Sequence, residues 1–527
     1  MGEGWTKTVS LEELKAKGRH VHRQDGRQIA IFDTPRGVFA CNNRCPHEGY
    51  PLREGTLDAD CKLTCNWHNW KFDLATGENQ RDGDRLRVYP VELRDGDVWI
   101  EIVDPPVAER KAKTMADLET AFRDHDYERI ARELARLVQI GADPTEAVAA
   151  AIGWSHDRFE FGWSHAYAGV ADWLRLYDER AEEPENRLIC LLEAIGHMAD
   201  DTLREEVFPY ETGVEAWNEE AFVAAIEAED EARAIRLTRG ALMAGNAFAL
   251  MERALTRGAL AHYNDFGHAL IYVPHAGSLI ARLGEGVAAP VLLSLVRGLA
   301  SAFREDLIPE FRGYADALAS FGTKPNGAAP APEAFLAHNA NKALAFTAEH
   351  GTASARDLFR SLLAANAMNM LTFHLRHLGD LDQPYGSDFG WLDLTHGLTF
   401  SNAVRKQCGR YPELWPAGLL QMACFSGRNI GHGDASVGLE DWKVADPDTF
   451  FAEVEETLFD HHQDEYIVSV HLLKTALAVR DLVGSQEAGE AGDIAMAALN
   501  RLLHSPIRTK MVRRTARQAM RFVATDV

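Results

Sequence analysis

Two short stretches near the start of the chain share one pattern, a cysteine followed closely by a histidine. They are Cys45-Pro46-His47-Glu48-Gly49-Tyr50-Pro51-Leu52 and Cys65-Asn66-Trp67-His68-Asn69-Trp70-Lys71-Phe72-Asp73. Seventeen residues separate the histidine of the first stretch from the cysteine of the second. Thiolate sulfur and imidazole nitrogen are common protein ligands of zinc and iron. The pattern therefore predicts a four-ligand metal site made by Cys45, His47, Cys65 and His68.

Both stretches resemble the cluster-binding loops of Rieske proteins, and Leu74-Ala75-Thr76-Gly77-Glu78 extends the resemblance. The resemblance covers roughly residues 1–104. It implies a [2Fe–2S] cluster in which two thiolates hold one iron and two imidazoles hold the other, at a higher potential than four thiolates would give. A Cys2His2 zinc site is the alternative. The match of both loops and of their flanks favours the cluster.

Two departures from the Rieske pattern bear on the type of cluster domain. Asn66 and Asn69 stand where the family usually has Pro and Gly. Neither loop has a second cysteine for the disulfide of the respiratory-complex type, which favours the ferredoxin and oxygenase type. We expect Trp67 and Trp70 to shield the cluster from water, one of the factors that set its potential.

The character of the chain changes after residue 104. Residues 1–104 alternate short, half-apolar runs with Gly, Pro, Asp and Asn, which predicts strands and turns. Pro105-Pro106 ends the last strand, and residues 105–114 favour a linker. Residues 115–527 are rich in Ala, Leu, Arg and Glu at helical spacing. The predicted fold class is multidomain α+β, a small all-β domain followed by a large all-α domain.

Composition narrows the classes of partner. The formal net charge of −24 over 527 residues argues against nucleic acid or an anionic membrane. We find no run near the roughly 20 apolar residues of a membrane span, and no apolar signal core at the start. The seven cysteines suggest no disulfide framework, so a cytoplasmic location is expected. No dinucleotide fingerprint appears. A separate reductase or ferredoxin is therefore the expected electron donor, and a homo-oligomer stays open.

The helical part has several histidines near the starts of apolar helices. The catalytic domain usual in Rieske oxygenases is mixed α/β with a 2-His-1-carboxylate iron. His262 and His268 have a tolerable spacing for it, but their flanks do not match and the domain is helical, so this assignment is rejected. Any single histidine is as often a hydrogen-bonded core or cap residue as a ligand. Several neutral imidazoles converging inside an apolar bundle would nevertheless suit iron.

These segments resemble the questin oxidase-like family of α-helical oxygenases, over about residues 115–510. The resemblance implies a mononuclear non-haem Fe(II) among several histidines, with a carboxylated lysine as a further ligand. Carried onto this chain, it predicts the ligands His165, His275, His396 and His471. It also predicts Lys474, one turn after His471, as the modified lysine, and a catalytic role for His396, His471 and Lys474.

Helix geometry leaves one of these ligands open. His268 and His275 are seven residues apart and share a helix face, so either could bind the metal. Pro274 predicts a kink or a restart of the helix just before His275. Asp172 is expected between the two metal centres or beside the ligands.

Three functions follow from these patterns. The first is an oxygenase: a cluster passes electrons to a histidine-bound iron, which activates O2 to oxidise a small apolar or aromatic substrate. The second is an electron-transfer protein whose helical domain is a docking or binding scaffold without a second redox metal. The third is metal-assisted hydrolysis or isomerisation beside a structural cluster. About three irons per chain would support the first and two the second.

Overall fold

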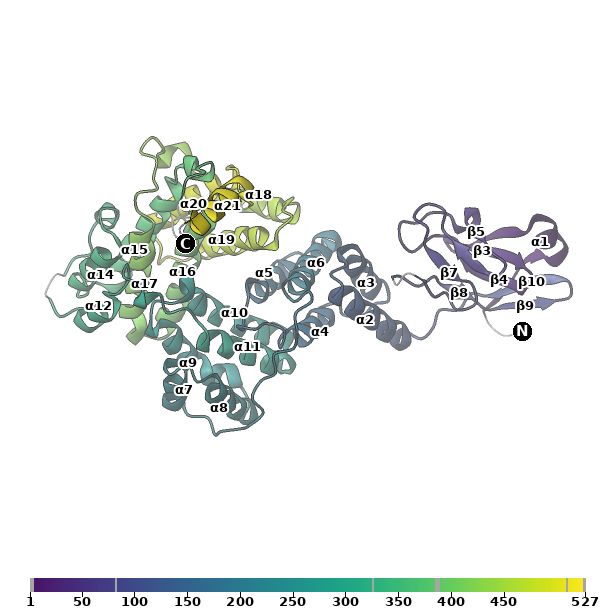
Figure 1. Cartoon of the computed structure of the whole chain (residues 1–527), viewed down its shortest axis with the longest axis horizontal. Helices are drawn as coiled ribbons and strands as arrows, with labels where there is room; N and C mark the ends of the chain where they lie inside the picture. Colours follow the sequence, from purple (N-terminus) through teal and green to yellow (C-terminus); the bar gives the residue numbers. More distant parts are fainter. Residues whose placement is uncertain (1–3, 81–82, 325–326, 384–388, 509, 525–527) are drawn as a thin grey trace. The chain divides into compact units, whose positions relative to one another are not determined.

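A computed structural model describes residues 4–80, 83–324, 327–383, 389–508 and 510–524 (Figure 1). The chain forms two compact units, Met1–Pro144 and Thr145–Val527. A small β domain near the N-terminus is followed by a large, entirely helical part, which confirms the predicted fold class.

Three antiparallel sheets make up the β domain. One sheet has the order β1-β10-β9, with β1 (Trp5–Ser10), β10 (Asp97–Glu101) and β9 (Val91–Arg94). A second has the order β2 (Arg19–Gln24), β3 (Arg27–Thr34), β4 (Gly37–Asn42) and β8 (Val88–Tyr89). The third joins β5 (Thr56–Leu57), β6 (Lys62–Thr64) and β7 (Lys71–Asp73). Helix α1 (Leu11–Lys17) is N-capped by the Ser10 hydroxyl.

The third sheet positions the second Cys-His stretch. Leu63 of β6 pairs with Phe72 of β7, and the chain between these strands is the loop that begins at Cys65. Cys45 and Cys65 both belong to a buried cluster that includes Leu63 and Phe72. The two sulfurs are thereby held on the same apolar core.

The segment expected to be a linker is helical. Residues 107–114 belong to α2 (Val107–Arg123), which is followed by α3 (Tyr127–Gln139), and the division between units falls after Pro144. The reason lies in the sequence VAERKAK, in which Ala, Glu, Arg and Lys are strong helix formers and no breaker occurs. Pro105-Pro106 ends the strand and then permits a helix start rather than a flexible connection.

Helices α4 to α21 form the second unit. Their bounds are α4 (Thr145–Ser155), α5 (His165–Glu179), α6 (Pro184–Asp201), α7 (Glu219–Glu227), α8 (Glu231–Ala244), α9 (Ala247–Ala261), α10 (His268–Leu283), α11 (Ala288–Ala300), α12 (Tyr314–Ser320), α13 (Pro332–Phe335), α14 (Ala340–Glu349), α15 (Ala355–Leu371), α16 (Trp391–Arg410), α17 (Trp415–Arg428), α18 (Pro447–Phe459), α19 (Tyr466–Gly484), α20 (Glu490–Leu503) and α21 (Val512–Ala524). Among the residues described, none of these helices combines the length and apolarity that a membrane crossing needs.

Four helices form the centre of this unit. Helix α5 packs on α10 and α19, and α16 packs on α10 and α19, so the four close into a ring. Their facing sides combine apolar residues with the histidines, the lysine and the polar groups described below. Inward-facing side chains on packed helices are the usual source of metal ligands in helical bundles.

The segment that leads into α5 depends on one glycine. Gly162 has φ +84°, and a Cβ at this position would lie 2.2 Å from the backbone nitrogen of Gly298 in α11. The next residue, Trp163, donates its indole N–H to the carbonyl of Val291 at 2.9 Å. Backbone and side chain together fix where α5 begins.

We predict that Gly162→Ala lowers the free energy of unfolding by about 2–3 kcal/mol, because the new methyl group meets backbone and the φ value is strained. Gly153→Ala is the matched control, since Gly153 lies in α4 with open space around it. It should stabilise by about 0.5–1 kcal/mol through helix propensity. Urea unfolding followed by far-ultraviolet circular dichroism measures both. Equal stability of the two variants would contradict this account of Gly162.

Candidate metal centres

Four histidines converge inside the helical unit, one from each helix of the central ring. His268 and His396 place their Nε2 atoms 2.8 Å apart, and those of His396 and His471 are 3.4 Å apart. The ring of His165 lies 4.6 Å from that of His268 and 4.7 Å from that of His471, centroid to centroid. One ligand atom from each of His165, His268 and His396 lies within 4.8 Å of the others. Cis ligands on bonds of about 2.1 Å would stand about 3.0–3.4 Å apart.

Backbone contacts fix the tautomers of two of these rings. Nδ1 of His396 lies 2.6 Å from the carbonyl oxygen of Leu392, and Nδ1 of His471 lies 2.5 Å from that of Ile467. A carbonyl only accepts, so each Nδ1 must carry the hydrogen and each Nε2 has a lone pair. Two lone pairs facing each other repel unless a cation lies between them. A ring whose Nδ1–H donates to a backbone carbonyl, and whose Nε2 lone pair is free, has the usual orientation of a metal-ligating histidine.

The environment keeps the imidazoles neutral. Burial lowers the pKa of His165, His396 and His471 well below the ordinary value, and it also lowers the pKa of His268. A neutral imidazole is the form that binds a metal. Nε2 of His165 is buried and has no hydrogen-bond partner. The donor set therefore fits a metal ion that prefers imidazole, such as iron or zinc.

A strained turn sets the position of His268. Asp265, Phe266 and Gly267 have φ values of +44°, +53° and +75° immediately before α10 begins. For Phe266 this region costs about 1–3 kcal/mol. Its backbone N–H donates to Glu305 at 3.0 Å, and the guanidinium of Arg428 stacks on its ring. This turn was not predicted, and Gly267 is the one local signal for it in the sequence.

Lys474 lies on α19 one turn after His471. Its side chain is buried, and Nζ has no hydrogen-bond partner. Burial lowers the pKa of Lys474 to about 8, although the charge of Asp172 acts in the opposite direction. A buried amine without an acceptor is costly unless it is neutral, modified or bound to another group.

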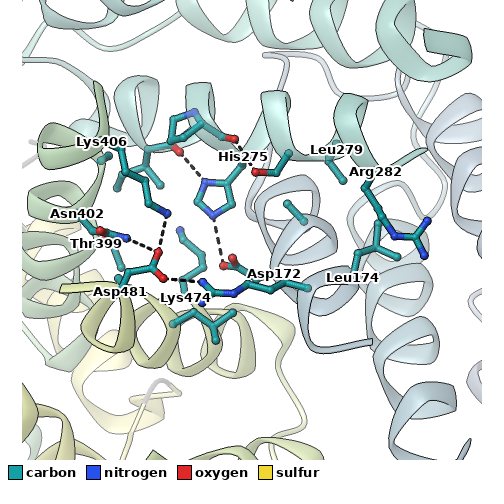
Figure 2. A pocket seen from close by; sticks show the side chains of 18 of the residues that line it. Asp172, Leu174, His275, Leu279, Arg282, Thr399, Asn402, Lys406, Lys474 and Asp481 are labelled. Carbon is teal, nitrogen blue, oxygen red and sulfur yellow. Dashed lines mark hydrogen bonds and ion pairs between the residues drawn. The ribbon is translucent and has the colours of Figure 1, made fainter. Parts of the chain in front are cut away.

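His275, the other ligand candidate on α10, points elsewhere. Its Nδ1 donates to the carbonyl of Ile271 at 2.6 Å, and its Nε2 lies 3.3 Å from a carboxylate oxygen of Asp172. Figure 2 shows this pair on the wall of a cavity of about 360 Å³ that Lys474 also lines. Of the two histidines that share this helix face, His268 is therefore the one beside His396. Asp172 contacts His275 and none of the four converging rings.

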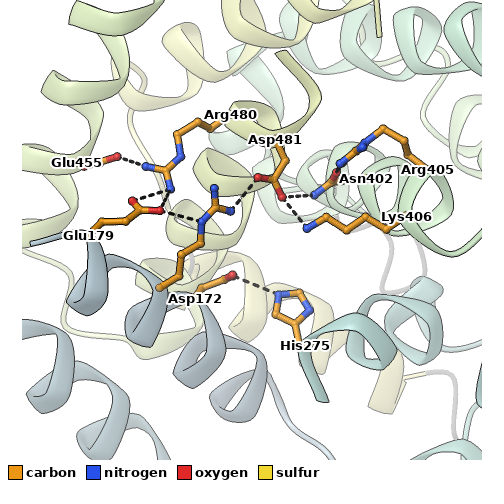
Figure 3. A network of polar contacts seen from close by, with 10 residues as sticks. Asp172, Glu179, His275, Asn402, Arg405, Lys406, Glu455, Arg480 and Asp481 are labelled. Carbon is orange, nitrogen blue, oxygen red and sulfur yellow. Dashed lines mark hydrogen bonds and ion pairs between the residues drawn. The ribbon is translucent and has the colours of Figure 1, made fainter. Parts of the chain in front are cut away.

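An ionic clamp borders the same cavity. Asp481 of α19 accepts from Arg175 of α5 at 2.8 Å and from Asn402 and Lys406 of α16 at 3.2 and 2.6 Å (Figure 3). Burial would raise the pKa of Asp481, but Lys406 and Arg175 outweigh it and hold that pKa at about 2. The carboxylate links three of the four central helices, a role that no local sequence pattern indicated.

A second cavity, also of about 360 Å³, reaches the histidines from another side. His165, His268 and Tyr272 lie on its wall, together with Trp163 and the segment that ends at Phe303. Phe161 and Phe303 at this cavity are 68% and 77% exposed. Two exposed aromatic side chains beside one cavity offer apolar surface that a ligand could cover. The sequence analysis did not identify this cavity.

His197 is a further histidine near the centre, and the sequence analysis did not name it. It lies on α6, its ring stacks on Tyr466, and its Nε2 is 3.6 Å from Asp201. Burial lowers the pKa of His197 to about 4. Its position inside the apolar run of α6 was the only signal in the sequence.

In the β domain, the two Cys-His loops have the same backbone geometry. The N–H of Cys45 donates to the carbonyl of Tyr50 at 2.9 Å, and that of Gly49 donates back to Cys45 at 2.8 Å. The second loop repeats both bonds, from Cys65 to Trp70 at 2.7 Å and from Asn69 to Cys65 at 2.9 Å. Because the two loops have the same pair of backbone hydrogen bonds, they direct the side chains of Cys45 and Cys65 to the same place.

The two unusual asparagines fit this geometry. Asn69 has φ +60°, the left-handed conformation that Gly49 adopts in the first loop, and asparagine tolerates it better than most residues. Asn66 donates to the carbonyl of Glu54 and accepts from Thr56, each at 2.9 Å. It therefore ties the second loop to the chain that follows the first.

The four predicted cluster ligands lie together. Cys45 and Cys65 are buried, and burial raises the pKa of Cys45 to about 12, although the backbone N–H groups of His47 and Glu48 act to lower it. The rings of His47 and His68 are 4.8 Å apart. Two buried sulfurs below two partly exposed imidazoles fit a [2Fe–2S] cluster with unlike ends.

Tryptophans cover both imidazoles to different degrees. Trp70 is partly buried and stacks on His47 at 4.5 Å between ring centroids. Trp67 stacks on His68 at 5.0 Å but is itself 57% exposed. Shielding is therefore stronger at His47 than at His68.

Comparisons with known proteins agree with this geometry. Residues 4–90 match the model of the Rieske [2Fe-2S] domain. The chain is 33% identical over 96 residues to a 4beta-methylsterol monooxygenase of Methylococcus capsulatus, covering 16% of this chain and 26% of that protein. It thus spans about a quarter of that relative's length. The ferredoxin of carbazole 1,9a-dioxygenase from Nocardioides aromaticivorans IC177 matches with 21% identity and a TM-score of 0.18, over 19% of this chain and 100% of its own.

A further relative covers most of its own length. The 3-phenylpropionate/cinnamic acid dioxygenase ferredoxin subunit of Escherichia coli (strain K12) is 34% identical over 76 residues, which is 14% of this chain and 72% of that subunit. With its paired loops and this relationship, the chain belongs to the Rieske [2Fe–2S] family.

Proposed function

We propose that the protein is an O2-dependent oxygenase. Its Rieske cluster delivers electrons to a mononuclear non-haem Fe(II) held in the helical unit, which belongs with the questin oxidase-like oxygenases. A separate reductase or ferredoxin supplies the electrons. The observation that carries the proposal is the convergence of four largely buried imidazole rings, with Nε2 of His396 lying 2.8 Å from that of His268 and 3.4 Å from that of His471.

The proposed ligands are His165, His268, His396 and His471. Bound there, a ferrous ion would supply the binding and reduction of O2. The carbonyls of Leu392 and Ile467 hold two of the rings in the ligating tautomer. Burial of the four helices excludes bulk water, which prevents loss of reactive species to side reactions.

The proposed substrate site is the aromatic cavity beside His165 and His268. Its walls include Trp163 and Tyr272, and its volume of about 360 Å³ lies in the range of small-molecule sites. A small apolar or aromatic molecule would bury its faces against these rings. Phe161 and Phe303 would then pack on the outer part of the substrate.

Lys474 is proposed to carry a carboxyl group that completes the ligand set. Its unpartnered, buried amine supports this, because carboxylation converts Nζ into an anionic oxygen ligand. The four imidazoles contribute no charge, so a single anionic ligand would offset part of the metal's charge.

We predict that His396→Ala removes the helical-unit metal and abolishes turnover while leaving the Rieske spectrum unchanged. Iron analysis should give about three irons per chain in the wild type and about two in the variant. His275→Ala is the matched control and should keep all three, since its ring contacts Asp172 instead. Full iron and turnover in His396→Ala would refute the site, and two irons in the wild type would favour an electron carrier.

We expect Phe303→Ala to weaken binding of an aromatic probe such as 2-naphthol by roughly three- to tenfold, through lost ring contact. The exposed position of Phe303 makes misfolding a poor explanation for such a change. Phe522→Ala, which removes an exposed aromatic ring from α21, should have no effect. Fluorescence titration of both variants measures this. Unchanged affinity in Phe303→Ala would place the substrate elsewhere.

Carboxylation of Lys474 predicts a carbamate signal in carbon-13 NMR after exchange with labelled bicarbonate. Lys474→Met should lose that signal and bind iron less tightly, by about tenfold or more. Lys443→Met alters an exposed lysine and should keep the signal. A signal that persists in Lys474→Met would rule out this lysine as the modified residue.

A further inference from the structure

A buried carboxylate joins α3 to the cluster domain. Asp84 lies in the segment between β7 and β8, and its side chain has no exposed surface. Nε and Nη2 of Arg132 each lie 2.7 Å from its Oδ2, and Nη1 of Arg136 lies 2.8 Å from its Oδ1. Arg129 approaches to 4.0 Å. Three arginines of one helix thus converge on one aspartate.

The spacing on α3 makes this convergence possible. Residues 129, 132 and 136 are three and four positions apart, so they lie on one face of the helix. Burial alone would raise the pKa of Asp84, but Arg136 and Arg132 outweigh it and hold that pKa below its ordinary value. The carboxylate is therefore ionised and fully engaged. Removing either side would leave buried charge without a partner.

The residue next to Asp84 touches a tryptophan of the cluster site. Gly83 has φ +121°, and a Cβ there would lie 3.1 Å from Cη2 of Trp70. The Trp70 ring in turn stacks on the cluster ligand His47, with an angle of 13° between the planes. A continuous series of contacts therefore runs from Arg132 and Arg136 through Asp84 and Gly83 to Trp70 and His47.

We propose that Asp84, held by Arg132 and Arg136, is a positioning residue for the cluster, which presses Trp70 onto His47. Helices α2 and α3 would then support the cluster domain and help to fix the position of its loops. Solvent exposure and contacts to the ligands are factors that set the potential of iron–sulfur clusters. The contact of Asp84 with Arg132 and Arg136, here called the latch, would thus maintain the reduction potential of the cluster by keeping water away from His47. This inference concerns the cluster alone and is independent of the helical-unit metal.

The midpoint potential of the cluster, measured in the full chain, distinguishes two effects of Asp84: positioning of Trp70 on His47, and the electrostatic effect of its charge on the cluster. Through charge alone, Asp84→Asn should raise the potential, while Arg132→Gln with Arg136→Gln should lower it. Through the latch, both variants release Trp70 and admit water, which stabilises the more highly charged reduced cluster. We therefore expect the potential to rise in both. Loss of cluster iron to a chelator should also become about tenfold faster in both.

Arg123→Gln is the control, because it breaks an exposed Arg–Glu pair on α2. It should leave potential and chelation rate unchanged. Shifts of opposite sign in Asp84→Asn and the double arginine variant would overturn the latch, and so would no shift in either.

A second measurement, made on protein from which the cluster has been removed, applies also to a variant that does not retain its iron. Modification of His47 by diethyl pyrocarbonate, mapped by mass spectrometry, should be faster in both variants, while that of His20 in β2 stays unchanged. Equal modification of His47 in the wild type and both variants would overturn the proposal.

Discussion

The centre of the helical unit is defined by one arrangement, in which four imidazole rings, one from each of α5, α10, α16 and α19, meet between the helices. Two of the rings donate Nδ1–H to a carbonyl of their own helix, which leaves their Nε2 lone pairs to converge. Burial keeps all four rings neutral, so no ring can relieve the repulsion by taking up a proton. A cation bound between the rings would satisfy the facing lone pairs of His396 and His471, and this is the part of the proposed metal centre that the packing of the four helices supports.

A strained turn and a network of ion pairs constrain the geometry around this site. The left-handed turn at Asp265 and Phe266 costs about 1–3 kcal/mol for each such residue. The salt-bridged Asp481 lies on the opposite side and links α5, α16 and α19. Buried ion pairs of this kind contribute more to a single arrangement than to net stability. Rigidity is what a site with closely spaced ligands requires.

The sequence predicted what is local. The Cys-His loops, the change from strands to helices and the histidines at helix starts all follow from short patterns. The choice between His268 and His275 could not be made locally, because both share one face, and which of them meets His396 depends on their positions along α10, about 10 Å apart. Residues 107–114 of the expected linker form the start of α2, because VAERKAK has high helix propensity and the prolines before it permit a helix start. Asp84 is one of several charged residues in the run Arg81-Asp82-Gly83-Asp84-Arg85, and its three arginines lie more than forty residues later.

The order in which the helical-unit residues occur in the chain has a consequence for biogenesis. His165 and His471 lie 306 positions apart in the sequence, so the centre can form only after the chain between them has been made. Loops this long close slowly, and the contacts that reward closure come last. A metal bound at the proposed centre would join helices that are distant in sequence, so it would stabilise the folded helical unit against unfolding.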